Sequence, residues 1–123
     1  MGTDVEQLGV VGSAIVEKFS LNISPDTPIY IGLNNRIHME NSHREIYLTY
    51  CDRMSEIISS PDYVGINPHD NSLEYYKKFN NEVIHIKIAV RSTAIGVYFA
   101  RSMYSVNDLS LNNYINSNRL KEV

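Results

Sequence analysis

Two histidines, His38 and His43, are the residues of this chain best suited to move protons. A free imidazole has a pKa of about 6.5, so near neutral pH one ring can accept a proton while a second donates one. On one continuous helix, five positions would place the two side chains about 140° apart. A helix break at Ser42 would instead put His43 in the first turn of a new helix, free to turn toward His38. The pair could then flank a phosphodiester. Alternatively, His38 packs beside Ile37 and His43 is simply solvated.

A second candidate group is basic and lies on a predicted strand. In residues 83–91, apolar side chains alternate with His85, Lys87 and Arg91, which predicts one core face and one polar face. With a suitable hairpin register, Lys77 at the end of the preceding strand shares that polar face. Such cations neutralise a phosphate and stabilise the charge that builds up during strand cleavage. The alternative is an ordinary solvated sheet face.

Two uncharged residues could complete a substrate site. Thr93 follows Arg91 and can donate a hydrogen bond to a phosphate, although a turn explains it equally well. Tyr98 lies on the next predicted strand, where an aromatic ring could stack on an unpaired base of single-stranded RNA.

We predict no metal site and no cofactor. His38 and His43 lack the i, i+4 spacing of a helical zinc site, and the single cysteine, Cys51, has no partner. Asp62 is more simply a turn residue than a ligand. No glycine-rich phosphate loop is present.

Length, charge and hydropathy limit the class of protein. The 123 residues predict a single domain, 1–123, and the net charge of −3 means that nucleic acid would be bound by a local basic face. No apolar run approaches the roughly 18 residues of a membrane span, so we expect no membrane association. The lone cysteine favours a reducing compartment and predicts a cytoplasmic protein.

The order of predicted elements is that of an α+β fold. Residues 1–18 form a lead-in helix or strand, with a helix or loose segment up to Gly12 and a strand over 14–21. The expected later elements are strand 28–31, helices 33–41 and 42–59, strands 73–79, 83–91 and 95–103, and either a helix over 109–115 or an edge strand in the tail.

Local signals set the boundaries of the second helix and of one hairpin. Ser42 and Glu45 have the spacing of a capping box at the start of that helix, and Pro61 ends it. Asn80 and Asn81 suit a hairpin turn between the first two strands of the later sheet.

These features together resemble a known family. The pattern comprises Arg36-Ile37-His38 with His43 five residues on, the helix end Ile57-Ile58-Ser59-Ser60-Pro61-Asp62-Tyr63, a strand ending in Lys77, and a strand ending in Arg91-Ser92-Thr93. It is similar to the phage-associated nuclease-like domains (PBECR) that are grouped with barnase, EndoU, the tRNA-cleaving colicins and RelE. The resemblance covers residues 19–123.

The resemblance implies two helices packed on one face of an antiparallel sheet of about four strands, as in barnase and RelE. It also implies metal-independent, toxin-like cleavage of single-stranded RNA or tRNA, with an immunity or antitoxin protein as a possible partner. His38 and His43 would then be the acid–base pair, and Lys77 and Arg91 would hold the phosphate. The chain departs from the family in having no tryptophan, with Tyr98-Phe99 at the corresponding strand.

Two other classes of function stay open. A nuclease fold without activity, binding protein or nucleic acid, would have a similar sequence, with its candidate residues scattered in space. The enzyme hypothesis instead requires a cleft that brings a histidine near Lys77 or Arg91. An oligomerisation domain would use tyrosines such as Tyr47 and Tyr75, since the chain has nine.

Overall fold

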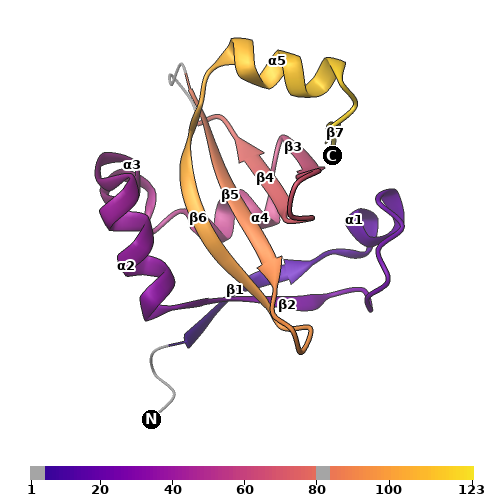
Figure 1. Ribbon diagram of the computed structural model, residues 1–123, viewed down its shortest axis with the longest axis horizontal. Coiled ribbons are helices and arrows are strands. Elements are labelled where there is room, and N and C mark those ends of the chain that lie inside the picture. The colour runs from indigo at the N-terminus through magenta and orange to yellow at the C-terminus, as the bar shows by residue number, and fades with distance from the viewer. Residues whose placement is uncertain (1–4, 80–83) are drawn as a thin grey trace.

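The computed structural model describes residues 5–79 and 84–123 and contains one sheet with helices at its sides and behind it (Figure 1). The strands are β1 (Val5–Val11), β2 (Thr27–Gly32), β3 (Tyr63–Ile66), β4 (Leu73–Lys77), β5 (His85–Ser92), β6 (Tyr98–Val106) and β7 (Leu120–Glu122). The helices are α1 (Ser13–Lys18), α2 (Leu33–Ser42), α3 (Arg44–Tyr50), α4 (Met54–Ser59) and α5 (Asp108–Asn116). The expected Asn80–Asn81 turn lies outside the described residues.

The sheet has the strand order β1-β2-β6-β5-β4-β3-β7. All neighbouring strands are antiparallel except β2 and β6, which are parallel and pair only through Ile29–Tyr98 and Tyr30–Phe99. Beyond this short pairing β6 leaves β2, and α2 and α3 lie along β6 instead. The helix pair therefore borders the centre of the sheet.

One face of the sheet, here called the core face, carries the main hydrophobic core. Tyr75, Ile88 and Met103 lie opposite one another on β4, β5 and β6 and are all fully buried. Alternation along each strand places every second residue on this face. Helices α3 and α4 cover it with the buried residues Tyr47, Tyr50, Met54, Ile57 and Ile58.

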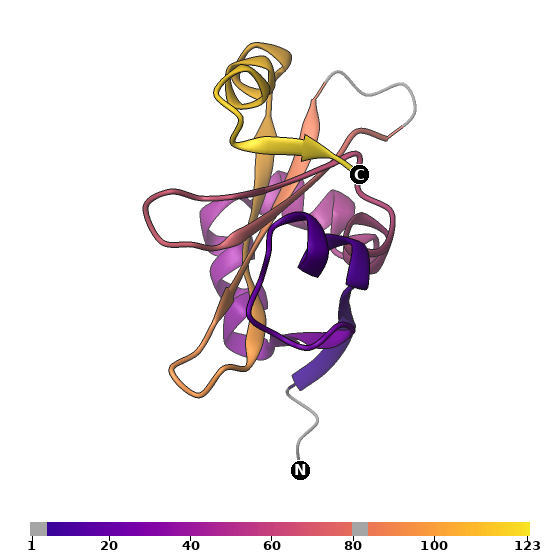
Figure 2. The same ribbon diagram turned by 90° about the vertical axis from the view of Figure 1, so that its right-hand side faces the viewer.

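The opposite face, here called the polar face, is covered only in part. Tyr76, Lys87 and Tyr104 lie opposite one another on it, and Glu74, Ala89 and Ser102 form the next row. Around Tyr76, a small second core brings together Val106, Leu111 of α5 and Leu120 of β7. Figure 2 shows α5 and β7 at the same end of the sheet, so these two elements cover only that end of the polar face.

A β-bulge interrupts the pairing of β5 with β6. Ala89 pairs with Ser102 while Val90 pairs with Ala100, so Arg101 has no partner on β5. A bulge turns the strand and redirects the extra side chain. It also makes our expected alternation in 95–103 wrong, because Met103 shares the core face with Ala100 and Phe99 lies opposite Arg91 on the polar face.

The α+β class is confirmed, but the expected four strands and two helices are too few. The described residues form seven strands and five helices, and the N-terminal assignment is reversed, since β1 comes first and α1 follows. Gly9 lies within β1: a Cβ there would lie 3.1 Å from Cγ2 of Ile58, so glycine lets α4 approach the strand. Strand β3 was missed because Gly65 and Asn67 resemble a loop.

The expected helix over 42–59 is two helices. The chain turns at Cys51–Arg53, so that α3 packs on α2 and β6 while α4 packs on β1, β4 and β5. The predicted capping box is also wrong: His43, not Ser42, occupies the N-cap of α3, and no side chain caps the helix there. The helix break itself was expected, and it separates His38 from His43.

No helix in the described part of the chain is long and apolar enough to span a bilayer.

Candidate active site

A pocket of about 410 Å³ opens on the polar face where α2 borders β6. It contains a histidine, two arginines and hydroxyl, amide and carboxylate groups. Its lining residues are Asn34, Asn35, His38, Asp70, Ala89, Arg91, Arg101 and Ser102. We call it the His38 pocket. His38 and Arg91, which come from different halves of the chain, therefore line the same pocket.

Three elements place the basic side chains of this pocket. Helix α2 runs beside β6 and presents His38, while β5 presents Arg91 on the polar face. The bulge of β6 explains Arg101, since in a regular strand its side chain would point away from that of Ser102. Instead both residues line the pocket.

The two arginines carry positive charge that the protein does not pair directly. Within residues 5–79 and 84–123, neither Arg91 nor Arg101 forms an ion pair within 4 Å, and both are exposed. Asp70 is the carboxylate of the pocket. Hydrogen bonds from the Ser72 hydroxyl and backbone N–H, aided by the charge of Arg91, hold the pKa of Asp70 below its usual range. Two arginines outnumber the one carboxylate, so the pocket has a positive charge that favours binding of an anion.

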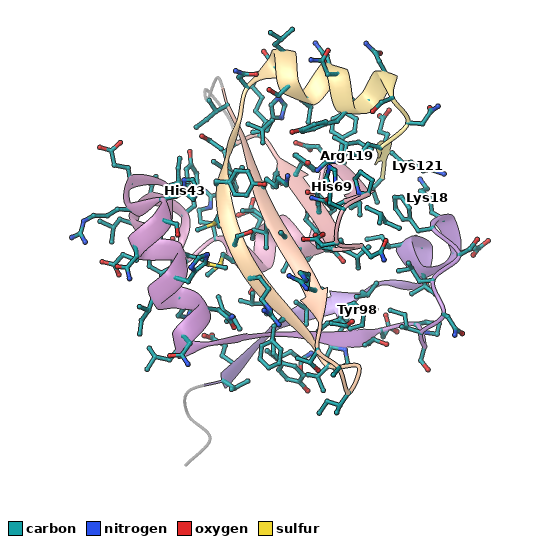
Figure 3. All side chains as sticks on the ribbon, viewed as in Figure 1. Lys18, His43, His69, Tyr98, Arg119 and Lys121 are labelled. Carbon is teal, nitrogen blue, oxygen red and sulfur yellow. The ribbon has the colours of Figure 1, made fainter. Side chains whose placement is uncertain are left out.

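His43 lies farther along the same border of the sheet (Figure 3). Its ring stacks on Tyr104 with centroids 5.3 Å apart, and Tyr104 is two residues from Ser102 of the His38 pocket. His38 thus lies near Ser102 and His43 against Tyr104, so both histidines lie beside β6, along a part of the polar face that we call the strip.

A buried ion network supports this strip, and sequence reasoning missed its central residue. Glu74 is fully buried; its carboxylate accepts Nζ of Lys87 at 2.7 Å and the guanidinium of Arg119 at 2.8 to 3.0 Å. The Tyr76 hydroxyl and the Asn67 amide also donate to it. A lone acid within the apolar strand Leu73–Lys77 was the available signal, because carboxylates are rarely buried unless paired.

Lys77 does not lie in this site. It pairs with Ile86 across β4 and β5, which places it on the core face, one residue out of phase with Lys87. The prediction that it shares the polar face with Lys87 and Arg91 is wrong. Its Nζ donates to the carbonyl of Ser60 at 2.7 Å, beside a separate pocket that Arg53 and Phe79 help to line.

The four residues predicted to bind substrate differ in their surroundings. Lys87 and His85 lie on the polar face but are buried; Lys87 contacts Glu74, and Nε2 of His85 lies 2.8 Å from Oδ1 of Asp108. Thr93 is in the β5–β6 turn, where its hydroxyl accepts the N–H of Val97. Tyr98 is half-buried and packs against the main core.

Burial also affects two tyrosines of β4. Desolvation raises the pKa of Tyr75 and of Tyr76, and the nearby carboxylate of Glu74 raises that of Tyr76 further. Both hydroxyls are therefore neutral.

In the part of the chain that is described, no three His, Cys, Asp or Glu side chains converge as metal ligands.

The comparison with protein families gives one match over most of the chain. The model described as phage-Barnase-EndoU-ColicinE5/D-RelE like nuclease3 (PBECR3) matches residues 6–113. No curated protein and no solved structure matches the chain. The matched region spans β1 to α5 and includes both histidines, the two pocket arginines and Glu74. The chain therefore belongs to the PBECR3 family, the third group of phage-associated nucleases described as like barnase, EndoU, colicin E5/D and RelE.

Proposed function

We propose that this protein is an endoribonuclease that cleaves RNA by metal-independent acid–base catalysis on the polar face. One observation carries the proposal: His38 lines the same pocket as Arg91 and Arg101, on the strip that also holds His43. A proton carrier beside two cations suits a phosphodiester. A guanidinium offers several N–H donors in a fixed fork that matches phosphate oxygens.

The arginines would bind the scissile phosphate. Arg91 and Arg101 come from the adjacent strands β5 and β6, and Ser102, which follows Arg101, also lines the pocket. As a nucleophile adds, the phosphate gains negative charge on its equatorial oxygens. Cations already fixed around it stabilise that charge without reorganisation.

The histidines would move the protons. One imidazole removes the proton of the ribose 2′-hydroxyl, whose oxygen attacks phosphorus and forms the new P–O bond. The bond from phosphorus to the 5′ oxygen breaks, and the second, protonated imidazole gives its proton to that oxygen. The products are a 2′,3′-cyclic phosphate and a free 5′-hydroxyl. This chemistry needs RNA, because DNA has no 2′-hydroxyl.

A cleavage assay in the presence of a metal chelator tests the proposal. Wild-type protein, His38→Ala and His43→Ala are incubated in excess EDTA with single-stranded RNA and with tRNA. We expect wild-type cleavage to persist and each variant to lose about 10²- to 10⁴-fold in rate, the usual contribution of a general acid or base.

Two variants serve as controls. His69→Ala removes an exposed histidine that lines none of the pockets described above, and Lys77→Met removes a cation from the core face; both should cleave normally. Wild-type protein that leaves all RNA intact contradicts the enzyme proposal, and RNA that is bound but uncut would support a binding module.

The proposed activity also suggests a protein partner. A toxin-like nuclease in the cytoplasm needs an inhibitor, and an immunity or antitoxin protein with carboxylates placed toward Arg91 and Arg101 would block the His38 pocket. Arg91→Glu should weaken binding of such an inhibitor more than Arg44→Glu, which changes an exposed arginine on α3.

A further inference from the structure

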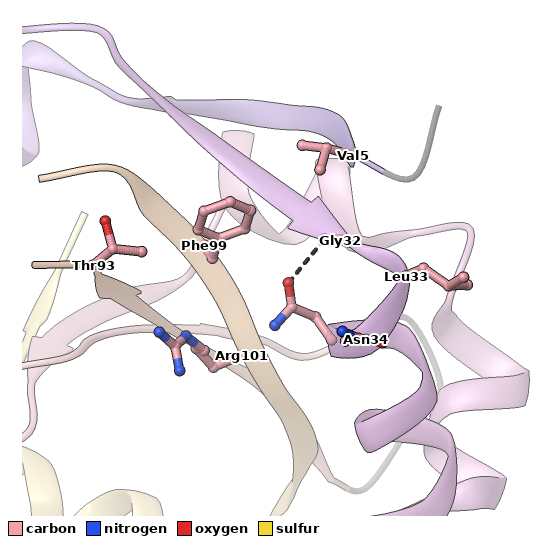
Figure 4. Close-up of a pocket in the computed structure, with 8 residues that line it drawn as sticks. Val5, Gly32, Leu33, Asn34, Thr93, Phe99 and Arg101 are labelled. Atoms are coloured by element: carbon pink, nitrogen blue, oxygen red, sulfur yellow. Dashed lines mark hydrogen bonds between the residues drawn. The ribbon is translucent and has the colours of Figure 1, made fainter. Parts of the chain in front are cut away.

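A second pocket, of about 340 Å³, adjoins the His38 pocket at the start of α2 (Figure 4). It combines an aromatic ring, a guanidinium, two amides and apolar walls. Its lining residues are Val5, Gly32, Leu33, Asn34, Asn35, Thr93, Phe99 and Arg101. We call it the Phe99 pocket. Asn34, Asn35 and Arg101 line both pockets, so the two pockets are direct neighbours.

The aromatic wall is suited to a planar group. Phe99 lies on the polar face opposite Arg91 and is only half-buried; its ring meets Tyr30 at a centroid distance of 6.0 Å and a tilt of 46°. Val5 and Leu33 add exposed apolar surface. Single-stranded nucleic acids are commonly held by stacking their bases on such rings.

The polar groups of this pocket are oriented. The Oδ1 atom of Asn35 accepts the backbone N–H of Gly32 at 2.8 Å, the bond dashed in Figure 4. Because this hydrogen bond occupies the amide oxygen of Asn35, the NH₂ group of the same amide is the part that can bind a ligand. Arg101 can only donate. Asn35 and Arg101 therefore both offer hydrogen-bond donors, and a ligand that pairs with them must carry an acceptor.

We infer that the Phe99 pocket binds the unstacked nucleobase next to the scissile phosphate, and that it prefers a base with a carbonyl oxygen to adenine. Two neighbouring donors pair best with a base edge that carries a carbonyl oxygen, which guanine, uracil and cytosine each have, whereas the N1 and N7 acceptors of adenine lie beside its amino donor. A donor facing that amino group leaves both hydrogen-bonding groups unpaired. The inference rests on the proposed function in taking RNA as the ligand.

Binding of uncleavable RNA tests the inference apart from catalysis. Short oligonucleotides with 2′-O-methyl riboses, which lack the attacking hydroxyl, carry one variable base in a constant sequence, and their affinity is measured by fluorescence anisotropy at one fixed salt concentration. We expect wild-type protein to bind the guanine, uracil and cytosine forms more tightly than the adenine form.

Two variants separate stacking from hydrogen bonding. Phe99→Ala should weaken binding of all the oligonucleotides about 5- to 150-fold, the range of one base–aromatic stack. Asn35→Asp keeps an oxygen for the Gly32 N–H but replaces the NH₂ donor, so the preference against adenine should shrink or reverse. Phe99→Leu keeps an apolar side chain, so its melting temperature should stay near that of the wild type. It lacks the aromatic ring and should therefore lose stacking, which shows that weaker binding does not come from misfolding.

Matched controls come from α5, away from both pockets. Leu109→Ala removes an exposed apolar side chain, and Asn112→Asp makes the same change of charge as Asn35→Asp. Neither should alter the base preference. Wild-type protein that binds all four oligonucleotides equally, or Phe99 variants that bind like wild type, overturn the inference.

The outcome for the pocket is distinct from the outcome for catalysis. Affinity lost in the Phe99 variants, together with base preference lost in Asn35→Asp, upholds the subsite even if ordinary RNA is never cut. Conversely, cleavage that depends on His38 without any effect of Phe99 or Asn35 on binding supports the enzyme and rejects the subsite.

Discussion

The imidazole of His43 stacks on the phenol ring of Tyr104, with centroids 5.3 Å apart and planes inclined by 26°. The same phenol ring lies 4.8 Å from Nζ of Lys87, which is in turn bonded to Glu74. Tyr104 thus connects a histidine at a helix break to the buried ion network of the sheet. A side chain that would otherwise move freely at the start of α3 is held against the polar face.

This contact predicts a positioning role for Tyr104. Tyr104→Leu should lower the rate of RNA cleavage with little change in RNA affinity, because His43 loses the surface on which it stacks. Tyr104→Phe keeps the ring and should restore the rate. Steady-state kinetics of both variants measures the effect, and a Phe variant as slow as the Leu variant would show that the ring itself is not what matters.

The Glu74 network predicts a large effect on stability. Glu74→Gln leaves Lys87 without its compensating charge in a buried site and should lower the free energy of unfolding by about 3–5 kcal/mol. Glu40→Gln breaks the exposed i, i+4 pair with Arg44 and should cost under about 0.5 kcal/mol. Urea unfolding followed by circular dichroism compares them. Equal losses would contradict a special role for the buried network.

Gly65 controls how closely β7 approaches β3. A Cβ at Gly65 would collide with the carbonyl of Arg119 and the side chain of Leu120, so Gly65→Ala must push β7 outward and draw Arg119 from Glu74. Overpacking of this kind costs about 1–3 kcal/mol in the free energy of unfolding.

Gly12→Ala is the matched control, because a Cβ there meets nothing within 4 Å and the backbone φ of −64° is open to any residue. Denaturant unfolding should show a clearly smaller loss for Gly12→Ala than for Gly65→Ala. The reverse order would mean that β7 adapts without strain.

The sequence predicts β5 well because its alternation is strict. Ile86, Ile88 and Val90 were expected in the core and are fully buried there, and Arg91 was expected on the opposite face, where it is exposed. A strand whose apolar and polar residues alternate has only one orientation that buries all of its hydrophobic side chains. The helix break between His38 and His43 was also predicted from local sequence.

Other features depend on relations that a single sequence does not encode locally. The face on which Lys77 lies is set by its register with Ile86, and the direction of Arg101 by a bulge opposite Ala89. A shift of one residue moves a side chain to the other face of a sheet. Arg119 reaches Glu74 only because β7 pairs with β3, a long-range contact with no periodic signal.

His85 and Asp108 predict a pH dependence of stability. The hydrogen bond with His85, aided by the charge of Lys78, lowers the pKa of Asp108 below its usual value. A carboxyl group whose pKa is lower in the folded state stabilises the protein above its unfolded pKa of about 3.9, and that contribution is lost as the pH falls through the folded value.

Asp108→Asn keeps a side-chain oxygen but removes the charge. Its melting temperature should therefore lie below that of the wild type at about pH 5, and the two should converge toward about pH 2, where both side chains are neutral. Thermal unfolding across this range measures the difference. A constant gap at every pH would show that the ionised carboxylate contributes nothing.

The most direct test of the acid–base site is the chemistry of its product. An oligonucleotide with one ribose at a defined position and 2′-O-methyl groups elsewhere is incubated with wild-type protein in excess EDTA, and the new ends are identified by mass spectrometry. We expect a 2′,3′-cyclic phosphate and a 5′-hydroxyl formed only at the ribose, and neither product with His38→Ala or His43→Ala. Cleavage at methylated positions, or a 3′-hydroxyl end, would contradict this mechanism.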